Sequence, residues 1–236
     1  MNNIIYIIFF NMCFNETVSL ATWLTGMTGS AMLLKLNKIP EAMFYGTTIQ
    51  MQLIEYFLWK NQPNCDKKCQ IPADNLCNQA NKNITKAGTI INHLEPIALL
   101  GGIALFSKRQ LPTFVIIYMI IFIIITFSYT YYIFDNTKND DSLGCSIVTE
   151  KSSPHLHWKW NDLKYKKIYY SLFLAALLLL SFYGLEDGKF QSALILISYI
   201  VSYFIYGNTK STGAMWCFMA AFAPWLLTIY FIIKKK

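Results

Sequence analysis

The chain has 236 residues, of which 55% are hydrophobic, and its formal net charge is +7 at pH 7. Its mean hydropathy of +0.36 is too high for a soluble domain of this size. The composition therefore excludes an ordinary soluble protein, and the length leaves room for one helical bundle but not for a second domain.

Apolar runs of about twenty residues, separated by polar connectors, cover most of the chain. A run of this length crosses a hydrocarbon layer of about 30 Å as an α-helix. We therefore predict an all-α, polytopic membrane protein with a single domain over residues 1–236, built as a seven-transmembrane-helix bundle. The predicted spans are about 16–36, 40–59, 85–106, 111–134, 166–185, 189–207 and 212–233.

The connectors and their charges indicate an orientation. Short connectors join the predicted spans pairwise, whereas the long connectors after the second and fourth spans leave on the same face. No Lys or Arg precedes the first span, while Lys35, Lys38, Lys108 and Arg109 lie on the opposite face with the terminal lysines. This distribution favours an outer N-terminus and an inner C-terminus, although the outer face carries the larger total of Lys and Arg.

Cysteine placement supports the same orientation. Cys65, Cys69, Cys77 and Cys145 all fall in the two long connectors. Four cysteines on one face predict disulfides in an oxidising compartment, and three connectivities remain open. The alternative is a metal knuckle that includes Cys65 and Cys69, which the reverse orientation would favour.

The second predicted span carries a polar seam. Steps of four, three, four, three and four residues separate its polar and aromatic members, so all of them lie on one helix face. The members are Glu41, Tyr45, Thr48, Gln52, Glu55 and Trp59. A face that includes an amide and two carboxyls should line the bundle interior or a cavity rather than contact lipid.

The third predicted span contains the costliest residues to bury. Asn92, His93 and Glu95 lie together near the middle of the bilayer, and Pro96 removes the helix hydrogen bond to the carbonyl of Asn92. Together with the seam residues, they predict an outward-facing polar pocket that binds or transports a small solute, an ion or a proton. The predicted pocket residues are Gln52, Glu55, Asn92, His93 and Glu95. A purely structural seam in an assembly protein without a ligand is the alternative.

A second alternative is a metal-dependent hydrolase that acts on lipid. In the segment SSPHLHWKW, His155 and His157 would lie on one side of an extended chain. With His93 and a nearby carboxyl they could hold zinc and a water molecule. The same segment also fits an aromatic belt at the membrane surface, which needs no metal.

The sequence otherwise lacks recognisable catalytic signatures. The seventh predicted span has no internal Lys that could bind retinal, and the chain has no phosphate-binding glycine loop, nucleophile elbow or HExxH motif. We therefore assign no catalytic residue, expect no cofactor other than the zinc alternative, and do not favour an enzyme. The expected partners are the lipid bilayer and a small solute or ion. Nothing indicates nucleic acid, and a homo-oligomer is compatible with the sequence.

Two segments carry a resemblance. IQMQLIEYFLW and TGAMWCFMAAFAPW, in a chain rich in Ile, Asn, Lys and Tyr, resemble uncharacterised multi-pass membrane proteins of large DNA viruses that infect algae and protists. The resemblance implies a viral membrane or an internal host membrane and no mechanism. Without it, the disulfide prediction indicates the secretory pathway or the plasma membrane.

Overall fold

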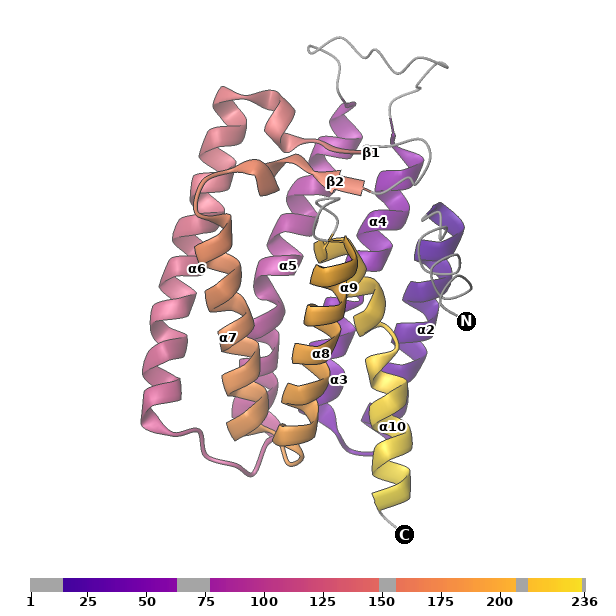
Figure 1. The fold of residues 1–236 in the computed structure, drawn as a ribbon, viewed down its shortest axis with the longest axis vertical. Helices are drawn as coiled ribbons and strands as arrows, with labels where there is room; N and C mark the ends of the chain where they lie inside the picture. The colour runs from indigo at the N-terminus through magenta and orange to yellow at the C-terminus, as the bar shows by residue number, and fades with distance from the viewer. Residues whose placement is uncertain (1–14, 63–76, 149–155, 207–211, 235–236) are drawn as a thin grey trace.

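The computed structural model shows a bundle of long helices that run side by side (Figure 1). The structure describes residues 15–62, 77–148, 156–206 and 212–234. The helices are α2 (Glu16–Lys35), α3 (Ile39–Thr48), α4 (Gln50–Lys60), α5 (Gln79–Phe106), α6 (Thr113–Asn139), α7 (Lys166–Gly184), α8 (Gly188–Tyr206), α9 (Thr212–Ala220) and α10 (Ala223–Lys234).

A small cap of irregular structure lies at one end of the bundle. It contains two antiparallel strands, β1 (Ser146–Val148) and β2 (Leu156–Trp158), and two 3-10 turns, η2 (Asp141–Gly144) and η3 (Lys159–Asp162). We call this the hairpin end, and the opposite end, where α7 turns into α8, the turn end (Figure 1). The strands were not predicted.

The mostly helical architecture confirms the predicted class in its coarse form. Every predicted span falls on helix in the described residues. Five helical segments are long and apolar enough to cross a membrane, by length and composition: Gln79–Phe106, Thr113–Asn139, Lys166–Gly184, Gly188–Ile205 and Thr212–Lys234. The other two predicted spans lack either length or hydropathy. α3 and α4 are short, and the Thr and Ser side chains of α2 lower its mean hydropathy.

Two of the predicted spans are each divided into two helices. The break between α3 and α4 is the single residue Ile49, whose side chain enters the space above Gly26 of α2. The break between α9 and α10 precedes Pro224, which lies in the first turn of α10, where its missing N–H is tolerated. The first break therefore accompanies the close contact between Ile49 and Gly26 of α2, and the second precedes the proline in the first turn of α10.

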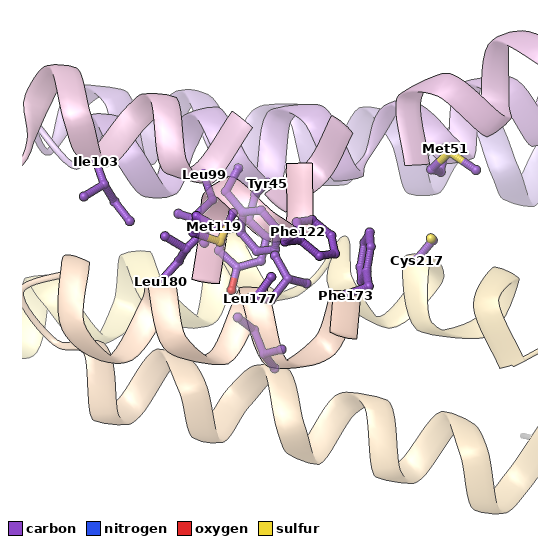
Figure 2. Packing of buried hydrophobic residues seen from close by; sticks show 14 of the residues in the cluster. Tyr45, Met51, Leu99, Ile103, Met119, Phe122, Phe173, Leu177, Leu180 and Cys217 are labelled. Carbon is purple, nitrogen blue, oxygen red and sulfur yellow. The ribbon is translucent and has the colours of Figure 1, made fainter. Parts of the chain in front are cut away.

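The interior of the bundle is apolar and aromatic. Figure 2 shows Tyr45, Leu99, Phe122 and Leu177 close together, and all four are buried. By contrast, α6 exposes one whole side. The exposed large apolar and aromatic side chains of α6 are Phe114, Ile116, Ile117, Ile120, Ile121, Ile124, Phe127 and Tyr131. An exposed stripe this long and this apolar suits contact with acyl chains rather than water.

A covalent link and a buried hydrogen-bond network fix the hairpin end. A disulfide joins Cys77, just before α5, to Cys145, just before β1, while Cys65 and Cys69 lie outside the described residues. The fully buried Asn81 of α5 accepts from the backbone N–H of Ser146 at 3.0 Å and donates to its carbonyl at 2.9 Å. The cap is thus bonded directly to α5.

Exposed ion pairs and one close backbone contact fix the turn end. Lys38 pairs with Glu186, and Lys234 pairs with Asp187. The Lys38 ammonium holds the pKa of Glu186 below its ordinary value, so this carboxyl stays ionised over a wide pH range. At the same end Gly102 of α5 lies against Pro40 of α3 so closely that an added Cβ would meet the Pro40 Cα at 2.9 Å.

Candidate functional site

Five of the six members of the polar seam of α3 and α4 are buried in the bundle, as predicted. Glu41, Tyr45, Thr48, Gln52 and Glu55 are each at most 4% exposed, whereas Trp59 is only half-buried. α3 packs closely against α5, so the second and third predicted spans, on which the predicted pocket residues lie, are neighbours. The seam therefore faces protein.

Glu55 lies toward the hairpin end of the seam and has few partners. The amide of Gln52 donates to its Oε2 at 3.2 Å. Its other oxygen, Oε1, is buried and has no hydrogen-bond partner among the described residues. None of the ion pairs formed by those residues involves Glu55. The charged form of this side chain would be costly here, because no Lys or Arg in the described part of the chain pairs with it.

Glu95 lies across from the seam, on α5. The amide of Asn92 approaches its Oε1 at 3.5 Å, which is too long for a strong hydrogen bond, while Asn92 accepts from the Tyr170 hydroxyl at 2.9 Å. Like Glu55, Glu95 forms no ion pair within the part of the chain that the structure describes. Tyr170 thus fixes the Asn92 amide beside the Glu95 carboxyl.

A small cavity reaches Glu95 from α8 and α9. Its volume is about 20 Å³, which is about the space that one water molecule occupies. The lining is largely apolar and includes few polar groups besides the Glu95 carboxyl. The lining residues are Phe44, Tyr45, Thr48, Glu95, Leu194, Ile195, Ser198, Trp216, Ala220 and Ala223. Glu95 therefore combines a buried carboxyl with adjacent free space.

The surroundings of both carboxyls border α9. Trp216 and Ala220 of α9 line the cavity at Glu95. α9 packs against α3 and α4, on which the seam lies. Glu55 and Glu95 thus belong to one interior region bounded by α3, α4, α5 and α9, although no hydrogen bond joins them directly.

His93 faces a different set of neighbours from Glu95. Its Nδ1 lies 2.6 Å from the Thr130 hydroxyl of α6, which itself donates to the Thr126 carbonyl at 2.8 Å. Because that hydroxyl proton is already used, His93 donates from Nδ1 and is the Nδ1–H tautomer. Its ring is enclosed by those of Tyr129, Tyr169 and Trp160, with centroids 4.7 to 5.8 Å away.

The five predicted pocket residues therefore separate into three groups. Gln52 contacts Glu55, and Asn92 contacts Glu95. His93 has no hydrogen bond or ion pair with either carboxyl among the described residues. The reason is angular: positions two residues apart on a helix lie on nearly opposite sides. The aromatic neighbours of His93 suit a structural role.

The zinc alternative gains no support from the described residues. They contain no group of three His, Cys, Asp or Glu side chains that could hold a metal ion. His157 lies in β2 with its Nε2 3.3 Å from the Asp162 carboxylate, and His155 lies outside the described residues.

Two residues of the interior polar network were not predicted from the sequence. Gln191 of α8 is 1% exposed and donates to the Glu41 carboxyl at 3.0 Å, so it extends the seam toward the turn end. Tyr170 of α7 holds Asn92. A lone glutamine in an apolar span is a detectable signal, because an amide in that position needs a partner. The tyrosine gives no such signal, because span ends are generally rich in tyrosine.

No protein-family model, no curated protein and no solved structure matches the chain.

Proposed function

We propose that this protein is a seven-span integral membrane protein that binds and transfers protons at the intramembrane carboxyls Glu55 and Glu95. In this proposal α2 and the α3–α4 pair also cross the bilayer, since they run along the bundle beside the five apolar segments (Figure 1). The hairpin end, with its disulfide, faces the oxidising side. The turn end, with Lys38, Lys108 and Arg109, faces inward, as the positive-inside rule favours.

One observation carries the proposal: two buried carboxyls lie on neighbouring helices with no cation beside them among the described residues. A buried carboxyl in this situation is most stable with a bound proton, because ionisation would place an unpaired charge in an apolar interior. The cavity at Glu95 has space for about one water molecule. A proton on the Glu95 carboxyl, with one water molecule beside it, fits a space of this size without separation of the helices.

The seam also provides hydroxyl and carboxyl groups between Glu55 and the turn end. Glu41 and Glu55 are separated by about 21 Å along the helix direction, at about 1.5 Å per residue. Between them lie Tyr45 and Thr48, both buried and both lining the cavity of Glu95. Hydroxyls and carboxyls can each donate and accept a proton. The Tyr45 hydroxyl and the Thr48 Oγ1 have no hydrogen-bond partner among the described residues, so transfer along this row requires water molecules between the groups.

Proton flux in liposomes tests the proposal. The purified protein is reconstituted with an internal pH-sensitive dye, and a pH gradient is imposed with valinomycin present to dissipate the membrane potential. We expect wild-type flux above that of empty liposomes and at least a tenfold loss in Glu95→Gln, which keeps the shape of the side chain but cannot exchange the carboxyl proton. Glu55→Gln should also lose flux.

Glu186→Gln is the matched control, because it removes one carboxyl outside the membrane spans. Its flux should equal that of the wild type. Thermal unfolding and gel filtration establish that each variant is folded. Wild-type flux no higher than that of empty liposomes, or full flux in folded Glu95→Gln, would overturn the proposal and favour a structural seam.

A further inference from the structure

A second, larger cavity opens at the turn end, away from Glu55 and Glu95. Its volume is about 400 Å³, within the range of small-molecule sites. The end of α7, the turn into α8, one residue of α10 and the loop before α6 enclose it. Its lining residues are Arg109, Phe182, Tyr183, Glu186, Asp187, Gly188, Lys189, Phe190 and Tyr230. We call it the turn pocket.

The acidic residues of the turn pocket are already paired. Glu186 pairs with Lys38, and that pairing lowers the pKa of the Glu186 carboxyl. Asp187 pairs with Lys234 and also accepts from the Tyr230 hydroxyl at 3.2 Å. Both carboxylates are therefore neutralised by lysines that are not among the lining residues.

The two cations of the turn pocket lack such compensation. Arg109 donates from Nη2 to the backbone carbonyl of Glu186 at 2.8 Å, which fixes the guanidinium but leaves its charge unbalanced. Lys189, in the first turn of α8, forms no ion pair with any described residue. With the two lysine–carboxylate pairs neutral, Arg109 and Lys189 give the turn pocket a net charge of +2.

The walls of the turn pocket suit the membrane surface. Phe182 and Phe190 are 40% and 38% exposed, so part of each ring is open to the surroundings. Phe190 stacks on Tyr230 with ring centroids 4.3 Å apart, and Phe182 meets Tyr183 edge to face. Aromatic rings beside cations, where apolar spans end, are typical of the headgroup region of a bilayer.

The shape of the turn pocket depends on a tight turn between α7 and α8. A Cβ at Gly188 would lie 2.3 Å from the Ser181 carbonyl oxygen, so only glycine permits this approach. The same turn places Gly188, Lys189 and Phe190, the first residues of α8, at the pocket. Arg109, Lys189 and a helix N-terminus on one concave surface form an anion site of the kind that phosphate prefers.

We propose that the turn pocket binds the phosphate of an anionic phospholipid from the leaflet at this end. Arg109 and Lys189 contact the phosphate, and Phe182 and Phe190 contact the glycerol backbone and the first acyl carbons. The acyl chains continue along the exposed apolar side of the bundle. This site does not depend on proton transfer at Glu95, and it holds even if the proton proposal fails.

Native mass spectrometry tests the site with lipid in detergent. The probes are phosphatidylglycerol, zwitterionic phosphatidylcholine and inorganic phosphate. We expect the wild type to retain phosphatidylglycerol at least about tenfold more tightly than phosphatidylcholine. Arg109→Gln with Lys189→Gln should remove this preference, and millimolar inorganic phosphate should not displace the lipid.

The double variant Lys35→Gln with Lys108→Gln is the matched control, because it removes two exposed positive charges close to the same end but outside the pocket. It should keep the lipid preference. If both double variants lose the lipid preference equally, the attraction is nonspecific and the proposal is overturned. Displacement of the lipid by inorganic phosphate would also overturn it and would assign the pocket to a free anion. Equal retention of both lipids by the wild type would overturn it as well. Gel filtration and thermal unfolding verify that the variants fold.

Discussion

The two ends of the bundle are held in different ways. At the hairpin end, a disulfide and the buried amide of Asn81 tie the cap to α5. At the turn end, the pairs Lys38–Glu186 and Lys234–Asp187 lie at the surface, and the carboxylate of Glu186 is 69% exposed. The disulfide and the Asn81 network are insensitive to salt, whereas screening weakens surface ion pairs, which include Lys82–Asp141 at the hairpin end. Changes of salt should therefore leave the disulfide and the Asn81 network intact and weaken the ion pairs of the turn end.

The largest expected effect is loss of the disulfide. Cys77→Ser with Cys145→Ser should lower the free energy of unfolding by about 4 kcal/mol, because the bond closes a loop between residues 68 positions apart. Reversible unfolding in detergent measures the change. Reductant should lower the wild type to the level of the variant and leave the variant unchanged. If reductant left the free energy of unfolding of the wild type unchanged, the disulfide would not stabilise the hairpin end.

The second largest expected effect is loss of the hydrogen-bond network of the cap. Asn81→Ala should lower the free energy of unfolding by about 2 kcal/mol, because it leaves the buried N–H and carbonyl of Ser146 without this partner. Asn83→Ala, on the exposed side of the same helix turn, should change it by less than about 0.5 kcal/mol. Equal costs for the two variants would show that the cap network adds nothing.

At the turn end, two neighbouring glycines give a matched pair. Gly102→Ala should cost about 1 to 3 kcal/mol, because the new Cβ would lie 2.9 Å from the Pro40 Cα, which is backbone. Gly101→Ala meets nothing within 4 Å, so it should raise the free energy of unfolding by about 0.5 to 1 kcal/mol through helix propensity. The same unfolding assay measures both, and a tolerated Gly102→Ala would refute the close contact.

The smallest expected effect is that of the surface ion pair. Glu186→Gln should lower the free energy of unfolding by less than about 1 kcal/mol, and high salt should abolish the difference. Since the pKa of Glu186 is lowered in the folded state, its contribution is complete above its ordinary pKa. The contribution disappears as the pH falls through the lowered value. Unfolding measured from pH 7 to pH 3 in both proteins should show the two curves merging at acid pH.

Much of the seam could be predicted from the sequence. Gln52 and Glu55 recur at helical spacing with Glu41, Tyr45 and Thr48, and that spacing alone places them on one side of a helix. The break at Ile49 was not predictable in this way, because it depends on the space that Gly26 of α2 leaves for the Ile49 side chain. The local sequence pattern predicts which side of a helix is polar, but it does not predict which residue of another helix packs against it.

The predicted pocket shows the same limit more clearly. Asn92, His93 and Glu95 are close in sequence, yet Asn92 and Glu95 contact each other while His93 turns to the aromatic rings of α6 and α7. The turn pocket depends even more on tertiary structure. Arg109, Lys189 and Tyr230 come from three separate segments, and no spacing rule connects them.

The sequence by itself determined the helical class, the helix positions and the burial of the polar seam. Each follows from local hydropathy and from the angular period of a helix, both of which depend only on residues close in the chain. Only the tertiary structure decided the partners of Glu55, Glu95 and His93, the Cys77–Cys145 pairing and the turn pocket. These features depend on which helices lie side by side, and that choice arises from shape and close packing between segments far apart in the chain.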